Sequence, residues 1–66
     1  MTVDVVQVEP LWTVDDVSSF LGVPVATLYE WRRHRRGPQA LRIGKYLRYQ
    51  PHRVREWLDQ LAETQQ

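Results

Sequence analysis

All nine lysine and arginine residues of this 66-residue chain lie between positions 32 and 55, in a segment that contains no Asp or Glu. The eight acidic residues lie outside it, so the formal net charge of +1 conceals a basic block with acidic flanks. A block of this kind attracts polyanions, and the distribution of charge, more than its total, predicts a nucleic-acid partner. The basic residues are Arg32, Arg33, Arg35, Arg36, Arg42, Lys45, Arg48, Arg53 and Arg55.

The other side chains form no recognisable catalytic or metal-binding pattern. Ser18 and Ser19 have no His nearby, and the three glycines are too scattered to form a phosphate-binding loop. The chain has no Cys, and His34 and His52 are its only strong nitrogen ligands, so neither a disulfide nor a zinc site is expected. We therefore expect no enzymatic activity, no cofactor and no small-molecule substrate.

These basic residues must be held in place by a thin hydrophobic core. A single domain of 66 residues buries only ~60% of the surface that its unfolded chain exposes. No segment is long and apolar enough to cross a membrane, and the N-terminus lacks the features of a signal peptide, so an intracellular protein is expected. The aromatic residues expected in the core are Trp12, Phe20, Trp31, Tyr49 and Trp57.

The sequence predicts a first helix between Thr13 and Gly22. Thr13 is a favourable N-cap, and Asp16 follows at the spacing of a capping box. Asp15 and Asp16 favour the positive helix N-terminus, which explains this acidic pair better than acid–base catalysis does. Gly22 provides a left-handed stop. The apolar face of this helix consists of Val14, Val17, Phe20 and Leu21, and Trp12 precedes the cap.

A second helix is predicted from Val25 to about Arg35, ending before Gly37. Its spacing places Val25, Leu28 and Trp31 on the inner face. Two helices joined by a short link that contains Gly are typical of a helix-turn-helix, whose second helix fits the major groove of DNA. Outward-facing residues are Ala26, Thr27, Glu30, Arg33 and His34, whereas Tyr29 either contacts a phosphate or packs beside the core.

A β-hairpin follows, with Gly44 between its arms. A two-residue loop would mix charged and apolar side chains on both faces, whereas a three-residue loop makes one face apolar and the other basic. We predict the three-residue loop. It places Arg42 opposite Arg48, a like-charge pair that an anionic partner would relieve, unless both side chains simply extend into water. The predicted pairs are Ile43 with Leu47, Arg42 with Arg48, and Leu41 with Tyr49, with Lys45 and Tyr46 at the tip.

A third helix is predicted to start at Pro51, a favoured residue of a first helical turn. Its apolar stripe has helical spacing and consists of Val54, Trp57, Leu58 and Leu61. Arg53 and Arg55 lie off that stripe, where they can contact phosphate.

The chain is therefore expected to have three parts. Residues 1–10 form an N-terminal arm, which is either a frayed tail or a short edge strand. Residues 11–62 form the domain, and residues 63–66 form a frayed tail.

Three groups of residues form a recognisable set across positions 11–58. The first group consists of Leu11, Thr13, Val17, Leu21, Gly22, Val23, Thr27, Leu28, Tyr29 and Trp31. The second consists of Arg42, Ile43, Gly44 and Arg48, and the third of Val54, Trp57 and Leu58. The set resembles the small winged helix-turn-helix domain that MerR-type regulators share with phage and plasmid excisionases. Pro24 departs from that family, which usually has Ser or Thr at the N-cap of the recognition helix, so the base-contacting set among Val25, Ala26 and Thr27 stays open.

The resemblance implies a mainly α fold with a small β-hairpin, the wing, and a supporting C-terminal helix. It also implies binding to double-stranded DNA, with the second helix in the major groove and the wing beside it. The residues expected to contact DNA are Val25, Ala26, Thr27, Tyr29, Glu30, Arg32, Arg33, His34 and Arg36 in the recognition helix, Arg42, Lys45, Tyr46 and Arg48 in the wing, and Arg53 and Arg55 at phosphates.

Because the chain ends at Gln66, without the effector domain of a full MerR-type regulator, the resemblance favours an excisionase, also called a recombination directionality factor. Such a protein binds tandem sites near an attachment site in the bacterial cytoplasm, bends the DNA and directs a phage integrase toward excision. The acidic flanks of one copy can contact the basic block of the next, which gives head-to-tail self-association. The alternatives are a stand-alone MerR-like transcription regulator and, from a different class, a protein-interaction or antitoxin-like module.

Overall fold

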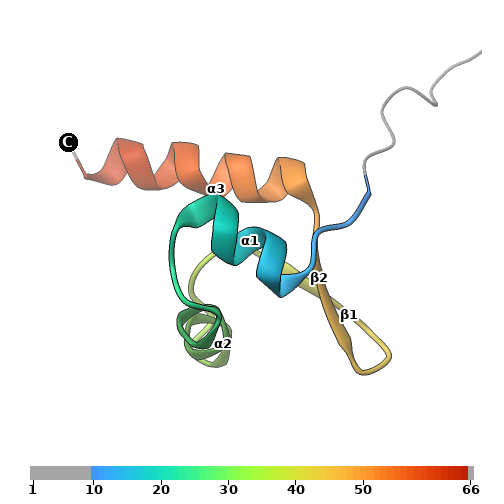
Figure 1. Cartoon of the computed structure of the whole chain (residues 1–66). Helices are drawn as coiled ribbons and strands as arrows, with labels where there is room; N and C mark the ends of the chain where they lie inside the picture. Colours follow the sequence, from blue (N-terminus) through green and yellow to red (C-terminus); the bar gives the residue numbers. More distant parts are fainter. Residues whose placement is uncertain (1–9, 66) are drawn as a thin grey trace, which may run out of the picture.

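The computed structural model describes residues 10–65, and in that range it contains three helices and one two-stranded antiparallel hairpin (Figure 1). In chain order the elements are α1 (Val14–Leu21), α2 (Val25–Arg33), β1 (Ala40–Ile43), β2 (Tyr46–Tyr49) and α3 (Pro51–Thr64). This arrangement confirms the predicted class, a helix-turn-helix followed by a wing and a supporting helix. No helix within the described range is long and apolar enough to span a membrane. Residues 1–9 of the predicted arm, which spans residues 1–10, lie outside that range.

Helix α1 has both of the ends that its sequence predicts. The Thr13 hydroxyl accepts a hydrogen bond from the backbone N–H of Asp16 (3.1 Å), and the Asp16 carboxylate accepts one from the backbone N–H of Thr13 (2.9 Å). These two bonds satisfy N–H groups that a helix start otherwise leaves unpaired. Gly22 adopts a left-handed conformation (φ 72°) and donates its N–H to the Ser18 carbonyl (2.8 Å). The predicted capping box and glycine stop are therefore confirmed.

The core lies where α1, α2, β2 and the start of α3 meet, and Tyr49 is its largest fully buried side chain, as predicted. The backbone of Tyr49 also exchanges two 2.8 Å hydrogen bonds with Trp12, on the side of β2 that does not face β1. This bridge attaches the segment before α1 to the hairpin. The buried core residues are Val14, Val17, Leu28, Leu47, Tyr49 and Val54.

Four of the aromatic residues predicted for the core lie at its edge instead. Phe20 is 48% exposed and packs against the Trp12 ring, with 4.9 Å between ring centroids. Trp31 and Trp57 are half-buried and pack against each other at 5.6 Å. A core built from three short helices and one hairpin is too small to enclose these rings on all sides, so they pack against each other in pairs at its edge.

Helix α2 ends two residues earlier than predicted. Its last helical residue is Arg33, and Arg35 adopts a left-handed conformation (φ 58°) that is unusual for a residue with a side chain. The N–H of Arg36 donates to the Trp31 carbonyl (2.7 Å) and that of Arg35 to the Arg32 carbonyl (3.1 Å). This is the hydrogen-bond pattern of a Schellman motif, with Arg where Gly is usual. Arg36, predicted in the recognition helix, therefore lies just beyond it.

The register of the hairpin differs from the prediction. The strands pair as Ala40–Tyr49, Leu41–Arg48, Arg42–Leu47 and Ile43–Tyr46, which leaves a two-residue loop of Gly44 and Lys45. The predicted three-residue loop, the Arg42–Arg48 pair and the uniform faces are wrong. Gly44, with φ 61°, occupies the first loop position, as expected for a type II′ turn.

The turn and the packing of β1 agree with this register. Gly44 has the positive φ that the first position of a two-residue turn needs, and Ala40, which pairs with Tyr49, packs against the core beside the buried Leu47 and Tyr49. Arg48 then lies on the opposite face, where its guanidinium carbon sits 5.2 Å from the centroid of the Tyr46 ring and its Nη1 donates to the Leu47 carbonyl (2.8 Å). The observed register therefore separates Arg42 from Arg48 and removes their repulsion.

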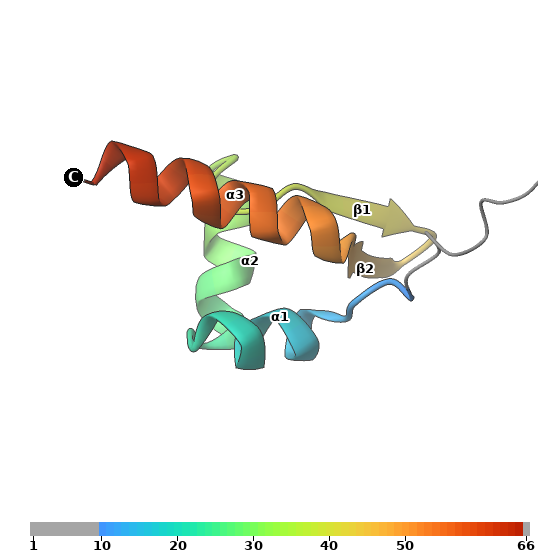
Figure 2. The ribbon, with the colours of Figure 1, turned by 90° about the horizontal axis from the view of Figure 1, so that it is seen from above.

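Helix α3 lies on the side of the molecule opposite α2 and the tip of the hairpin, and its C-terminal end extends away from the hairpin (Figures 1 and 2). Only Pro51 and Val54, both near its start, are buried. The rest of its predicted apolar stripe is half-buried, and the helix includes Glu63 and Thr64, two residues of the predicted tail. The supporting role of α3 therefore rests on its first turns.

Candidate nucleic-acid interface

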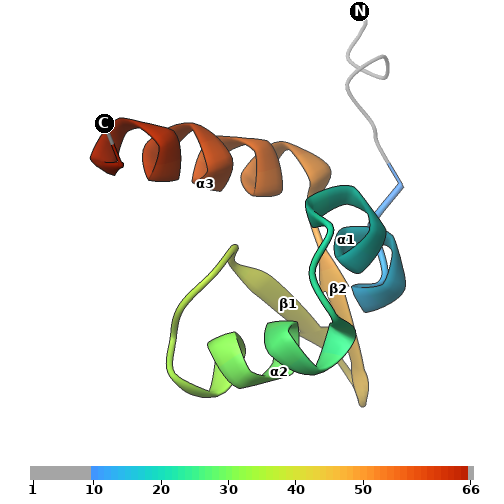
Figure 3. The ribbon, with the colours of Figure 1, turned by 60° about the vertical axis from the view of Figure 1, so that its left-hand side comes forward.

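Helix α2 and the hairpin lie side by side (Figure 3), and a cleft of about 280 Å³ opens between them. The helix contributes Arg32 and Arg33 to its wall, and the hairpin contributes Arg42 and Lys45. Tyr29, Tyr46 and Leu47 complete the lining, which contains no carboxylate. Four cations and two tyrosines around an open cleft suit a phosphate, because phosphate oxygens accept hydrogen bonds from guanidinium, ammonium and hydroxyl groups.

The buried side of α2 determines which residues reach this cleft. Leu28, only 1% exposed, fixes the helix on the core, so the residues of the opposite face point to solvent. On the core side of α2, burial raises the pKa of the Tyr49 phenol above its usual value, and the nearby charge of Arg32 partly opposes this rise. Arg32 therefore lies between the core and the cleft, and Arg33, with a 72% exposed side chain, projects farther out.

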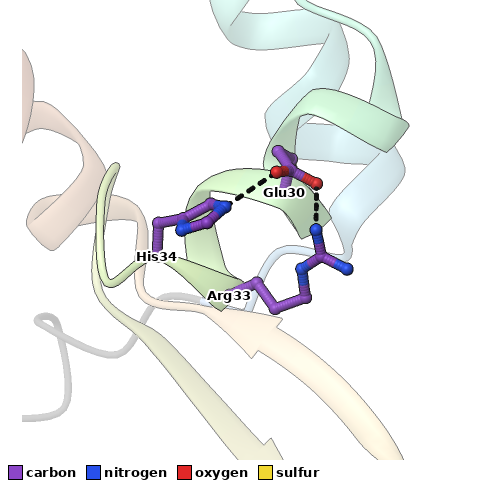
Figure 4. Close-up of polar contacts among 3 residues, drawn as sticks. All are labelled: Glu30, Arg33 and His34. Atoms are coloured by element: carbon purple, nitrogen blue, oxygen red, sulfur yellow. Dashed lines mark hydrogen bonds and ion pairs between the residues drawn. The ribbon is translucent and has the colours of Figure 1, made fainter.

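The outer face of α2 carries a network of three side chains, joined by one ion pair and one further hydrogen bond (Figure 4). One Glu30 oxygen, Oε1, lies 2.8 Å from Arg33 Nη2, and the other, Oε2, lies 2.8 Å from His34 Nε2. All three side chains are more than half exposed. The hydrogen bond from His34, followed by that from Arg33, lowers the pKa of Glu30, so the carboxylate stays ionised at neutral pH.

The first turn of α2 meets the core. Val25, named from the sequence both as inward-facing and as a candidate DNA contact, packs against the core cluster. Ala26 is exposed and Thr27 is half-buried. Of the three positions left open in the sequence, Ala26 is thus the one that the described structure presents most fully to a partner.

The wing cations lie on both faces of the hairpin. Arg42 faces the cleft together with Leu47, its partner across the strands. Lys45, in the loop, places its Nζ 5.6 Å from the Tyr46 ring centroid, and Arg48 contacts the same ring from its own strand. Tyr46 is 53% exposed, so this aromatic ring and its two cations form the outer surface of the wing.

A second basic hollow, of about 420 Å³, lies beyond the end of α2. Arg32, Arg35 and Arg36 contribute its cations, and Arg32 lines both hollows. Arg35 was not among the predicted contacts. No residue type at this position indicates its left-handed turn, because backbone hydrogen bonds to residues of α2, rather than a glycine, accompany that turn.

The α3 cations do not reach the cleft between α2 and the hairpin. Arg53 lies 3.7 Å from Glu56 on its own helix, and the guanidinium carbon of Arg55 lies 5.8 Å from the centroid of the Trp12 ring. Their contact with phosphate stays a prediction. Among residues 10–65, no cluster of three His, Cys, Asp or Glu side chains is arranged to hold a metal ion.

Comparison with known proteins adds one finding to this geometry. A family model described as a helix-turn-helix domain matches residues 13–62, which covers α1, α2, the hairpin and most of α3. No curated protein and no solved structure matches the chain.

Proposed function

The chain belongs to the helix-turn-helix domain family, a family of DNA-binding proteins that includes excisionase-like members, and from this membership we propose that it is an excisionase. In this role it binds tandem double-stranded DNA sites beside an attachment site, bends the DNA and directs a phage integrase toward excision. The observation that carries the proposal is the basic cleft between α2 and the hairpin, which provides two DNA-binding elements at one surface.

The position of the cleft between α2 and the hairpin supports binding in two neighbouring grooves of DNA. With α2 in the major groove, the hairpin enters the adjacent minor groove, and the strand between the grooves lies in the cleft. Arg32, Arg33 and Arg42 then surround its phosphates, and Lys45 at the hairpin tip reaches farther along the backbone. Contacts on both sides of one strand favour a bent duplex, because bending brings more phosphates within reach of the same cations.

The separation of charge supports binding side by side. Asp15 and Asp16 are exposed at the start of α1, and Asp59 and Glu63 are exposed on α3, on the side opposite the hairpin tip. A neighbour on the same duplex can place Arg35 and Arg36 of its second basic hollow against these acids, and neither of these two arginines lines the cleft. Such a contact is heterologous, so it continues along the DNA rather than closing into a dimer.

Salt dependence tests the DNA-binding part of the proposal. Affinity for a duplex should fall linearly on a log–log plot against salt concentration, with a slope of about −0.9 for each phosphate neutralised, so four cleft cations predict a slope near −3.6. Arg33→Ala should make the slope shallower by about 0.9. A flat response in the wild type would instead favour a protein partner.

Footprinting on the DNA around the protein's own gene tests the finer role. Tandem protected sites beside an integrase attachment site, with bending in a circular-permutation gel assay, are the expected results. A single unbent site over a promoter would contradict the excisionase role and favour a stand-alone transcription regulator. Excision assays with the cognate integrase, with and without the protein, then measure its effect on the direction of recombination.

A further inference from the structure

Glu30 is the only acidic residue of α2, and it lies on the exposed face of a helix that otherwise presents cations to the cleft and its surroundings. A carboxylate in this place repels the phosphate backbone and so lowers the affinity for DNA of any sequence. Its two oxygens are nonetheless held in a defined position, 2.8 Å from Arg33 on one side and 2.8 Å from His34 on the other (Figure 4). Glu30 therefore lowers the affinity for DNA of any sequence while its carboxylate oxygens are held in one position. A residue that contacts one base selectively is expected to combine these two properties.

We propose that Glu30 determines specificity by accepting a hydrogen bond from the N4 amino group of a cytosine in the major groove. The inference rests on the proposed binding of α2 in that groove and adds the base that the helix selects. Each carboxylate oxygen uses one acceptor position for its partner on α2 and retains another for a base.

Cytosine is favoured because of the groups that each base exposes in the major groove. Cytosine presents only a donor there, whereas guanine presents the acceptors N7 and O6, and thymine presents the acceptor O4 and a methyl group. Adenine has a donor at N6, but the acceptor N7 beside it repels an ionised carboxylate. Because the pKa of Glu30 is lowered, the carboxylate is ionised and acts only as an acceptor.

The decisive variant is Glu30→Gln, which keeps the shape of the side chain and adds donors. The wild type and the variant should each be selected on a library of randomised duplexes. We expect a C·G preference at one position for the wild type and a shift toward adenine at that position for Glu30→Gln, since an amide bonds both N6 and N7 of adenine. The change in relative affinity at that position should be about 5- to 150-fold.

Glu30→Ala supplies a second measurement. It should lose the preference at that position and bind a fixed duplex of unrelated sequence more tightly than the wild type, because the repulsion from phosphate is gone. Glu56→Gln is the control matched to Glu30→Gln, because Glu56 also forms an i,i+3 ion pair with an arginine, Arg53, but lies on α3 away from the cleft, and it should leave base preference unaltered. Thermal unfolding of each variant checks that the domain remains folded.

The outcomes separate this inference from the proposed function. If the wild type binds duplexes and both Glu30 variants retain its base preference at every position, Glu30 only stabilises the helix through its contacts with Arg33 and His34, and the inference is overturned while DNA binding stands. If the wild type selects no duplex at all, the proposed function fails and the inference fails with it.

Discussion

The two helices of the helix-turn-helix are held in place by different means. Helix α1 carries its own boundaries, because Thr13 and Asp16 cap its start and Gly22 ends it. Helix α2 starts after Pro24 with no side-chain cap and ends at Arg33, two residues before Arg35, which adopts a left-handed conformation without being a glycine. Both helices, with eight and nine residues, are shorter than the ~12–15 residues that an isolated helix needs to be even marginally stable in water, so both depend on the core and only α1 adds side-chain signals at its ends.

This difference matches a supporting role for α1 and a recognition role for α2. Local signals stabilise α1, which contributes two buried valines to the core and faces no DNA in the proposed complex. Helix α2 depends on tertiary contact through Leu28, its one buried residue, and its charged side chains, Glu30, Arg32 and Arg33, lie in its C-terminal half. Because α2 is held by the residue that faces the core, its outward-facing side chains are not needed for capping or packing. Those side chains can therefore be selected for contact with a partner. Four variants test this division, beginning with the largest expected effect.

Leu28→Ala should destabilise the domain by about 2–5 kcal/mol, because it removes the buried anchor of α2 and leaves a cavity. A domain of this size typically has only ~3–5 kcal/mol of stability, so much of the population should unfold. Chemical denaturation followed by circular dichroism measures the loss. Phe20→Ala is the comparison in α1: its larger side chain is 48% exposed, and its truncation should cost only about 1 kcal/mol. Equal losses would show that Phe20 stabilises the domain as much as Leu28 does and would contradict its position at the edge of the core.

Gly37→Ala should be the next most damaging change, with a loss of about 2–3 kcal/mol from a left-handed residue and a steric clash together. Gly37 has φ 76°, and an added Cβ would lie 2.7 Å from Cε3 of Trp31, in the last turn of α2. Gly44→Ala is the matched control, since its φ is 61° but no atom lies within 4 Å of its Cβ position. It should cost about 1–2 kcal/mol. Identical losses would mean that the contact with Trp31 does not hold the end of α2.

Thr13→Ala should cost about 1 kcal/mol by removing the N-cap of α1. Thr64→Ala provides the control, because the Thr64 hydroxyl donates only to the Leu61 carbonyl at the exposed end of α3. Denaturation midpoints of the two variants and the wild type measure the difference. DNA affinity of Thr13→Ala, determined where the protein is fully folded, should be unchanged. A loss of affinity there would place the cap of α1 in the DNA interface and contradict the division between the two helices.

The same division explains which parts of the fold the sequence could predict. The boundaries of α1 follow from Thr13, Asp16 and Gly22, which act within a few residues of one another. The end of α2 and the register of the hairpin do not, because the first is set by hydrogen bonds from Arg35 and Arg36 back to the helix and the second by the turn at Gly44 together with the packing of Ala40 beside Tyr49. Uniform hairpin faces favoured a three-residue loop, whereas the observed register pairs Arg42 with the buried Leu47.

The candidate site divides in the same way. The basic block is visible as a count of residues, and helical spacing places Glu30 and Arg33 on one face of α2. Spacing alone could not show that Glu30 contacts Arg33 and His34 at once, or that Arg42 lines the cleft while Arg48 lies on the other face of the hairpin. Those facts depend on side-chain positions and on the strand register.

The smallest expected effect comes from giving α2 the cap that it lacks. Pro24→Ser should add a side-chain cap worth about 0.5–2 kcal/mol. Loss of the proline ring should offset this gain by about 0.4–1 kcal/mol, because the unfolded chain becomes more flexible. Pro24 has the extended conformation of an N-cap (φ −63°, ψ 149°), so serine fits without rearrangement. Pro24→Ala, which loses the ring and gains no cap, isolates the two contributions. Serine should be about 1 kcal/mol more stable than alanine at this position. Equal stability in denaturant titrations would show that α2 gains nothing from a local signal and is held by tertiary contact alone.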